Sequence, residues 1–463
     1  MSQTSRQLAF LALRAVHRGA FADVAVDKAL QHSDLMTADK RLFTELVYGS
    51  IRRQRTLDTL IDQLGKKKSH QQPPDLRLIL HLGFYQLAYL SQIPVSAAVN
   101  TTVELAKQNG FAGLSGVVNG LLRQYLRLTE TDSTETDSTE TDSNRANLTI
   151  PLTLPTNPIQ HFGILHSYPD WIIAIWLEQF GHTDTEQLCQ WMNQPPTIDL
   201  RVNRLQATIE QVEVAFQQAE IQTQRVPPLP DALRLLTHPG SIQALPGFRE
   251  GWWMVQDSSA QLVSYLLDPQ PGETVIDACA APGGKTAHLA EMMADQGIVW
   301  ACDKTPSRLK KLEQNRDRLQ LHSIRLHTGD SRTFTHFQNQ ADRVLLDAPC
   351  SGLGTLHRHA DARWRQTPDS VAQLAQLQTE LFHRAATWVK PDGSLVYATC
   401  TLHPAENEQQ IDRFLQTHPN WQLIPPAPDS PVATFATANG WCKVLPHQHQ
   451  MDGFFMALLK RRS

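Results

Sequence analysis

The strongest constraint on the fold is an alternation of short apolar segments with amphipathic segments in the carboxyl-terminal half of the chain, from Gly251 onward. Short apolar runs bounded by turn residues predict strands, and an apolar spacing of three to four residues predicts helices. Alternation of the two predicts an α/β domain with a mainly parallel, doubly wound sheet. In such sheets ligands bind beyond the carboxyl ends of the strands. The expected strands span residues 274–277, 298–302, 324–327, 344–346 and 395–398.

Three segments are expected before this domain, which spans residues 251–463. Residues 1–128 carry helical apolar spacing, which predicts an all-α domain with one long helix at 38–61. Residues 129–150 begin with three Thr-Glu-Thr-Asp-Ser repeats. Such a tract has nothing to bury and repels itself, so we expect an acidic, solvated linker. Residues 151–250 mix helical and extended patterns and predict a small α/β module.

Composition places the chain among globular proteins. Its 463 residues suggest about three domains, and 41% hydrophobic and 19% charged residues exclude a wholly disordered chain. Because signal-peptide and membrane-spanning patterns are missing, we expect a soluble, cytoplasmic protein. None of the 6 cysteines forms a Cys-x-x-Cys pair, so neither a zinc site nor a redox motif is expected. Residues 1–128 hold 16 Lys and Arg against 9 Asp and Glu, which favours a polyanionic partner.

The first expected strand ends in a segment suited to a ligand, Asp277-Ala-Cys-Ala-Ala-Pro-Gly-Gly-Lys-Thr286. Small residues let a ligand approach the backbone, and the following helix offers free N–H groups at its amino terminus. The dinucleotide pattern Gly-x-Gly-x-x-Gly is absent. The phosphate-loop pattern matches at Gly284 and Lys285, but Cys279 stands where its first glycine belongs. A nucleotide hydrolase therefore stays open as an alternative.

Acidic residues at the ends of the next two strands favour a nucleoside ligand without a phosphate chain. Asp303 follows Gly283 by twenty residues, where an acid can hold both ribose hydroxyls. Asp330 ends the third strand, where a carboxylate could accept a hydrogen bond from an adenine amino group. Together with Asp277 and the glycine turn, these acids predict S-adenosylmethionine as the ligand.

Two cysteines follow the fourth and fifth strands, in Asp347-Ala-Pro-Cys-Ser-Gly352 and Tyr397-Ala-Thr-Cys-Thr401. A thiolate is a strong nucleophile where its surroundings lower its pKa. Adding a thiolate to C6 of cytosine makes C5 able to attack a sulfonium methyl group. A carboxyl group hydrogen-bonded to N3 favours this addition, and a base must afterwards remove the C5 proton. Two thiols and one acid beside a methyl donor supply these parts, and the chemistry alone does not say which thiol adds.

These residues resemble the NOL1/NOP2/Sun family of RNA cytosine-C5 methyltransferases, and within it the bacterial branch that modifies 16S rRNA. The resemblance implies S-adenosylmethionine as cofactor, 16S rRNA as substrate and partner, a Rossmann-like methyltransferase domain and a NusB-like fold for residues 1–128. It also implies a monomer that needs neither metal nor membrane. In one departure, Ala360 stands where the family usually has proline. Segments outside the site that carry the resemblance are 39–49, 117–123, 200–203, 255–261 and 452–455.

By this resemblance Cys400 is the nucleophile, Cys350 assists release of the adduct, and Asp347 contacts the cofactor or the base. DNA cytosine methyltransferases use the cysteine of the Pro-Cys strand end, so Cys350 remains an alternative nucleophile. An RNA-binding or antitermination factor without catalysis is the other alternative. Cys279 and Cys302 are expected to pack or to line the cofactor site. The expected cofactor-binding residues are Cys279, Ala280, Ala281, Pro282, Gly283, Gly284, Lys285, Asp303, Asp330 and Asp347.

The RNA must present the target base unpaired or flipped out, because a duplex hides C6. Basic and aromatic residues after Cys350 would hold phosphates and stack a base. Basic residues of the helical domain, including 66–68, would widen the electrostatic footprint, and Arg201 would help the middle module to present RNA. The expected RNA-binding residues are Arg358, His359, Arg363, Trp364, Arg201, Arg52 and Arg53.

Overall fold

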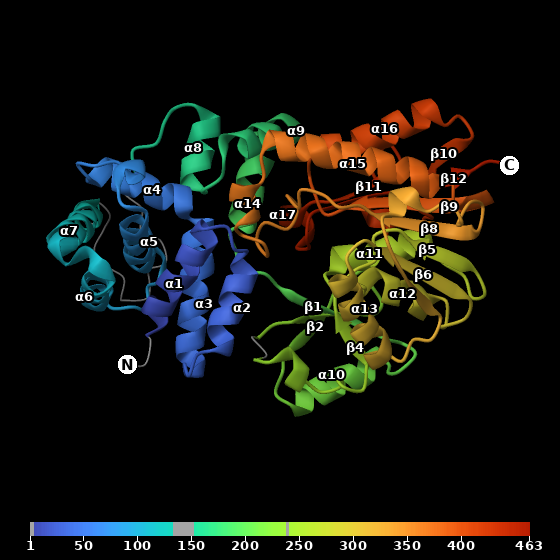
Figure 1. Ribbon diagram of the computed structural model, residues 1–463, viewed down its shortest axis with the longest axis horizontal. Coiled ribbons are helices and arrows are strands. Elements are labelled where there is room, and N and C mark those ends of the chain that lie inside the picture. Colours follow the sequence, from blue (N-terminus) through green and yellow to red (C-terminus); the bar gives the residue numbers. More distant parts are fainter. Residues whose placement is uncertain (1–3, 133–151, 238–239) are drawn as a thin grey trace. The chain divides into compact units, whose positions relative to one another are not determined.

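The computed structural model describes residues 4–132, 152–237 and 240–463, which form two compact units (Figure 1). The first unit comprises Met1–Asn193 and Leu356–Arg365, and the second comprises Gln194–Thr355 and Gln366–Ser463. Most of the predicted acidic linker lies outside the described residues, which resume at 152. Among the residues that the structure describes, none of the helices is long and apolar enough to span a bilayer.

The first unit is helical, as expected for residues 1–128. Its central helix α5 (Pro74–Tyr89) is buried almost continuously from Leu76 to Leu87, because neighbouring helices pack on several of its faces. The single helix expected at 38–61 is wrong, because the chain breaks at Arg53. The other helices are α1 (Ser5–His17), α2 (Ala22–Gln31), α3 (Thr37–Arg52), α4 (Gln54–Leu64), α6 (Val95–Ala106), α7 (Ser115–Asp132), α8 (Pro158–Leu165), α9 (Asp170–Trp191) and α14 (Ala362–Arg365).

Two segments outside residues 1–128 belong to this helical unit. Helices α8 and α9 do so although they lie in the range 151–250 predicted for the α/β module. Residues 356–365, which contain α14, follow the loop of Cys350. They are held by backbone groups: the Trp364 indole Nε1 donates to the carbonyl of Ile51 over 2.8 Å, and Asp361 accepts from the amide of Ala22 over 3.2 Å.

The second unit contains a small antiparallel sheet with strand order β2-β3-β1-β4 and one covering helix, α10 (Ile209–Gln218). Its inner face buries Leu200, Val202 and Leu233 against Val212 and Phe216 of α10. An α/β module was predicted for this region, and its last strand lies just past residue 250. The strands are β1 (Ile198–Val202), β2 (Thr223–Arg225), β3 (Ala232–Leu235) and β4 (Trp253–Val255).

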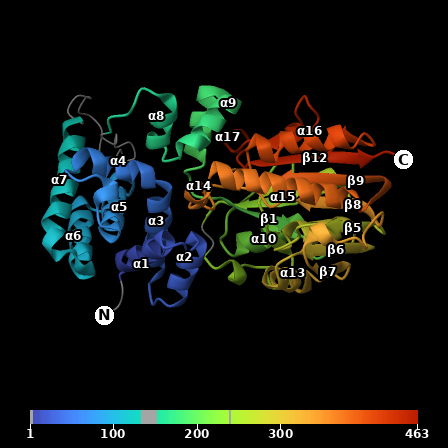
Figure 2. The same ribbon diagram turned by 45° about the horizontal axis from the view of Figure 1, so that its top comes forward.

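The larger sheet has the strand order β10-β12-β9-β8-β5-β6-β7, with β11 paired to β12. The strands from β12 to β7 can be followed in Figure 2. Strands β5 to β9 are parallel to their neighbours, and β12 pairs antiparallel with β9. The doubly wound prediction is therefore confirmed, and the strand order reverses where β5 lies between β6 and β8. The strands are β5 (Thr274–Asp277), β6 (Ile298–Asp303), β7 (Ile324–Thr328), β8 (Ala341–Asp347), β9 (Val389–Thr399), β10 (Trp421–Ile424), β11 (Cys442–Val444) and β12 (Phe454–Arg461).

Helices cover both faces of this sheet. Val275, Val299 and Leu345 face the core shared with α11, α12 and α13, whereas Ile276 and Leu346 face the core shared with α15 and α16. The helices are α11 (Ser258–Leu267), α12 (Gly284–Met292), α13 (Pro306–Arg318), α15 (Pro368–Ala386), α16 (Glu408–Thr417) and α17 (Pro446–His449).

Candidate functional site

The loop between β5 and α12 has the backbone that a close-lying ligand requires. Gly283 has φ +105, and a Cβ there would lie 2.6 Å from Leu312 Cγ, so only glycine fits. Asp277 is buried at the end of β5 and accepts a hydrogen bond from the Thr286 hydroxyl over 2.7 Å. Burial raises the pKa of Asp277 to about 7. The carboxyl group thus ties the end of the strand to the start of α12 and fixes the loop between them.

The two further acids stand at the ends of β6 and β7. Asp303 is 5% exposed, and its Oδ1 accepts from the Thr305 amide over 2.8 Å, while Arg308 lies 3.4 Å from Oδ2. Asp330 is more exposed, and hydrogen bonds from Arg332 lower its pKa. The Gly329 amide donates to the Asp303 carbonyl over 3.1 Å, so the ends of the two strands are adjacent.

These residues fit S-adenosylmethionine. A glycine turn that leaves no room for a Cβ, free N–H groups at the start of α12 and a carboxylate at the end of the second strand match what a nucleoside needs. Cys279 and Cys302 lie nearby, and burial raises the pKa of each thiol. Both are therefore unreactive thiols, consistent with packing or lining.

The two cysteines of the strand ends meet. Cys350 lies in the loop after β8, Cys400 directly follows β9, and their Sγ atoms are 3.3 Å apart. The hydrogen bond to Cys400, with burial, raises the pKa of the Cys350 thiol well above its usual value. Either sulfur can donate the hydrogen bond that joins them.

An ion pair lies beside the two sulfurs. Lys285, at the start of α12, donates to Asp347 Oδ2 over 2.8 Å and lies 4.8 Å from the centre of the Phe454 ring. Burial lowers the pKa of Lys285, but the charges of Asp347 and, to a lesser extent, Cys400 and Asp277 outweigh burial and raise it. Lys285 is therefore held as a cation, paired with Asp347.

Three of the arginines predicted to contact RNA are buried, and the structure contradicts that prediction for them. Arg363 is 0% exposed and donates to Asn193 Oδ1 over 2.9 Å and to backbone carbonyls. Arg52 is 6% exposed and donates to the carbonyl of His357 over 3.0 Å. Their guanidinium groups cannot reach a phosphate, because each is enclosed by the helical unit.

Arg201 is buried for a different reason. It is 1% exposed, forms a two-pronged ion pair with Glu291 at 2.7 and 2.9 Å, and donates to the Gly284 carbonyl over 2.8 Å. Arg201 therefore links the small sheet to the loop that was predicted to hold the cofactor, and it supports that loop instead of contacting RNA.

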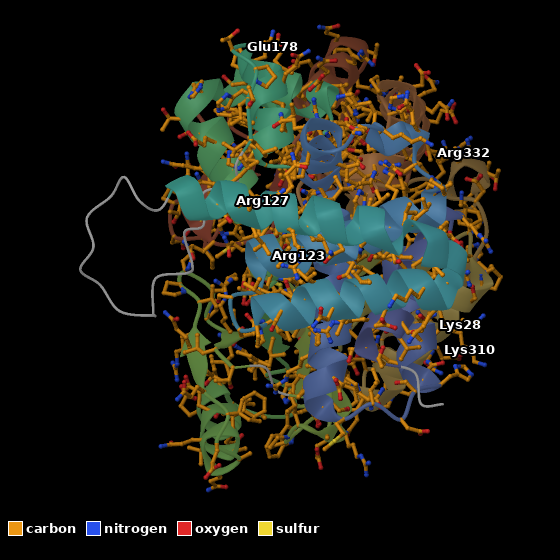
Figure 3. All side chains as sticks on the ribbon, turned by 90° about the vertical axis from the view of Figure 1, so that its left-hand side faces the viewer. Lys28, Arg123, Arg127, Glu178, Lys310 and Arg332 are labelled. Atoms are coloured by element: carbon orange, nitrogen blue, oxygen red, sulfur yellow. The ribbon has the colours of Figure 1, made fainter. Side chains whose placement is uncertain are left out.

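The remaining predicted RNA contacts are partly or fully accessible. His359 is exposed, whereas Arg358, Trp364 and Arg53 are half-buried, and Arg53 lies 4.8 Å from the centre of the Tyr89 ring. Residues 66–68 are exposed lysines. Sequence reasoning gave no weight to Arg123 and Arg127, which project from α7 at the surface of the helical unit (Figure 3).

Sequence reasoning also missed Glu406 and Asn407, two fully buried polar residues next to the cysteines. Their only local signal is the unusual Glu-Asn pair that follows Cys400 closely in the sequence. In the described ranges there is no cluster of three or more His, Cys, Asp or Glu side chains placed to bind a metal ion.

Comparison with known proteins places the chain in a family. The family described as 16S rRNA methyltransferase RsmB/F matches residues 264–460, the NusB family matches 3–127, and the ferredoxin-like domain of RsmF/B-like methyltransferases matches 168–243. A Synechocystis protein named probable ribosomal RNA small subunit methyltransferase B is 48% identical over 99% of both chains. A Bacillus subtilis protein of the same name is 34% identical over 100% of both chains. The chain belongs to this methyltransferase family.

Solved structures agree with this assignment. The crystal structure of PH0851 is 27% identical and superposes with a TM-score of 0.79 over 100% of both chains. A methyltransferase homologue from Pyrococcus horikoshii is 29% identical, with a TM-score of 0.58 over 66% of this chain and 100% of its own. The chain is thus a Rossmann-like, S-adenosylmethionine-dependent RNA methyltransferase with a NusB domain, as the resemblance implied. Family membership decides against a nucleotide hydrolase and against a purely RNA-binding factor.

Proposed function

We propose that the protein methylates C5 of a cytosine in 16S rRNA, in the cytoplasm, through a covalent bond between Cys400 and C6 of the base. One observation carries the proposal: the Cys350 and Cys400 sulfurs lie 3.3 Å apart, beyond the carboxyl ends of adjacent parallel strands. A nucleophile needs only one sulfur. A second sulfur at this distance suits the elimination that must free the enzyme from the product.

Cys400 acts first. Its thiolate adds to C6, the S–C6 bond forms, and the electron pair of the C5=C6 bond makes C5 nucleophilic. The carboxyl group of Asp347 placed at N3 favours this addition. Lys285, paired with Asp347 at 2.8 Å, supplies positive charge beside the attacking sulfur.

The adduct must then be released. S-adenosylmethionine, held by the loop between β5 and α12 and by Asp303, would supply a methyl group on a positively charged sulfur for transfer to C5 and would leave as S-adenosylhomocysteine. Loss of the C5 proton to a base restores the C5=C6 bond, breaks the C6–S bond and returns the thiolate to Cys400. The 3.3 Å between the Cys350 sulfur and the sulfur that must leave supports a role for Cys350 in this step.

The test is to trap the covalent intermediate. RNA with 5-fluorocytosine at the target should stay attached to the wild-type enzyme, because fluorine at C5 cannot leave as a proton does. Cys400→Ala should abolish the adduct, whereas Cys350→Ala should still form it. Cys442→Ala, a buried cysteine of β11, is the matched control. The reverse pattern would exchange the two roles, and no adduct with any form would refute the covalent route.

We also propose that the enzyme acts as a monomer without a metal and contacts RNA through Arg358, His359, Trp364 and Arg53. His359 is exposed and the other three side chains are half-buried, which supports this part of the proposal. Mapping 5-methylcytosine in 16S rRNA from cells that lack the protein tests the substrate. Loss of one methylated cytosine is expected, and an unchanged methylation map would refute the assignment.

A further inference from the structure

Two adjacent residues beside the cysteines have no part in the chemistry described so far. Glu406 ends a short 3-10 helix, Pro404–Glu406, and Asn407 directly precedes α16. Both side chains are 0% exposed. Burying a carboxyl group and an amide is costly unless hydrogen bonds repay it, so their partners indicate what they do.

Glu406 holds the segment of Cys350. Its Oε1 accepts from the amide of Ser351 over 2.9 Å, and its Oε2 accepts from the Ser351 hydroxyl. Gln378 of α15 donates to Glu406 Oε1 over 3.0 Å and to the carbonyl of Pro349 over 2.9 Å. The residues immediately before and after Cys350 are therefore both anchored to this pair of side chains.

Asn407 holds the segment of Cys400 in the same way. Its Oδ1 accepts from the Thr399 hydroxyl over 2.5 Å, and its Nδ2 donates to the carbonyl of Thr401 over 2.9 Å. The Ser351 and Thr401 hydroxyls, each one residue past a cysteine, are 2.8 Å apart and join the two segments.

We propose that Glu406 and Asn407 are positioning residues that together set the distance between the sulfurs of Cys350 and Cys400. The sheet cannot do this alone, because the pairing of β8 with β9 ends at Asp347 and Ala398, before either cysteine. Beyond that point the Gly354 amide donates to the Cys400 carbonyl over 3.0 Å, but it lies four residues past Cys350. The catalytic consequence rests on the proposed function, whereas the geometric claim does not.

The distance can be measured without RNA by thiol–disulfide exchange. In a buffer of reduced and oxidised glutathione, the two thiols give up two electrons and two protons to form one disulfide, and one oxidised glutathione becomes two reduced molecules. The equilibrium constant reports how well the protein holds the two sulfurs together. Mass spectrometry of peptides that contain Cys350 and Cys400 measures it in the full-length protein.

Three variants separate position from charge and from general stability. Glu406→Ala removes both hydrogen bonds that Ser351 donates to Glu406, so the equilibrium constant should fall at least about tenfold, since small misplacements of reacting groups are costly. Glu406→Gln should remain within about twofold, because its oxygen can still accept and its amide can donate to the Ser351 hydroxyl. Glu408→Ala, which removes the 2.7 Å ion pair with Lys443 at the start of α16 and touches neither cysteine segment in the contacts given above, is the matched control and should match wild type.

The outcomes are distinct. The inference is supported if the equilibrium constant for disulfide formation falls in Glu406→Ala and in Asn407→Ala but not in Glu408→Ala. This holds even if the wild-type enzyme never forms an RNA adduct and the proposed function fails. An unchanged equilibrium constant in folded Glu406→Ala overturns it. If Glu406→Ala does not fold, Ser351→Ala replaces it, and the same comparison with Glu408→Ala decides. In methyl transfer, Glu406→Ala should lower kcat at an unchanged KM for RNA, with rescue by Glu406→Gln.

Discussion

We expect Arg363 to be the residue that contributes most to holding residues 356–365 in place, so replacing it with alanine should destabilise that segment. Its guanidinium donates to Asn193 Oδ1 over 2.9 Å and to the carbonyls of Ser167 and Arg52 over 3.2 and 3.3 Å. It also lies 4.2 Å from the centre of the Tyr168 ring. Three charge-assisted hydrogen bonds at about 1.5 kcal/mol each and a buried cation–π contact of about 2 kcal/mol give roughly 6.5 kcal/mol.

Part of that gain offsets the cost of burying the charge. Burial lowers the pKa of Arg363 to about 10, against an ordinary 12.5, which corresponds to about 3 kcal/mol. Truncation removes this cost together with the contacts. The net loss of stability for Arg363→Ala is therefore about 3 kcal/mol.

Hydrogen–deuterium exchange of the full-length protein measures this loss locally. In peptides that cover 356–365, amide protection should fall about 100-fold, because protection tracks the free energy of local opening. Amide protection should fall less in Arg363→Lys, because lysine keeps the charge but lacks the planar guanidinium group that donates several hydrogen bonds at once. Arg123→Ala, an exposed arginine on α7, is the control and should change nothing in these peptides (Figure 3). Protection within about threefold of wild type in Arg363→Ala would refute the reasoning.

Two further predictions concern the cofactor loop. Because burial raises the pKa of Asp277 from 3.8 to about 7, the protonated form stabilises the fold below pH 4, and this contribution is lost as the pH rises through 7. Asp277→Asn should therefore gain Tm relative to wild type between pH 4 and pH 8, and parallel Tm curves would contradict the assigned pKa. In Gly283→Ala the alanine must adopt φ +105 and displace Leu312, at a cost of about 1–3 kcal/mol. Calorimetry should therefore show that S-adenosylhomocysteine binds about tenfold more weakly or worse. Unchanged affinity would exclude the loop as the cofactor site.

The sheet and the strand-end residues were predictable because their signals are local. Apolar runs bounded by turns located β5 to β9, and parallel strands bring their carboxyl ends to one edge, so Cys350 and Cys400 were expected to approach each other. The glycine turn was predictable for the same reason, because Gly283 adopts a positive φ that residues other than glycine rarely adopt. What was local in the sequence could be predicted.

The burial of arginines could not be predicted in this way. An arginine in a loop is usually exposed, and only the carbonyls that meet Arg363, contributed by residues near 52, 167 and 193, make a buried position tolerable. The same holds for Arg201, whose partner Glu291 lies 90 residues away in the sequence. Glu406 and Asn407 were overlooked because the segments of Cys350 and Cys400, to which they bond, become neighbours only after β8 pairs with β9.

The path of the chain changes how a deletion of the helical domain should be interpreted. The chain leaves the catalytic unit after Thr355, five residues past Cys350, and returns to it at Gln366. Between these points Arg363, Trp364 and Asp361 bond to the backbone or side chains of residues that precede 194. Removing residues 1–128 therefore strips the partners Ala22, Ile51 and Arg52 from a segment tethered to the catalytic loop. Lost activity in such a truncation would not by itself measure RNA binding by the NusB domain, whereas substitutions at exposed positions such as 66–68 leave this segment intact.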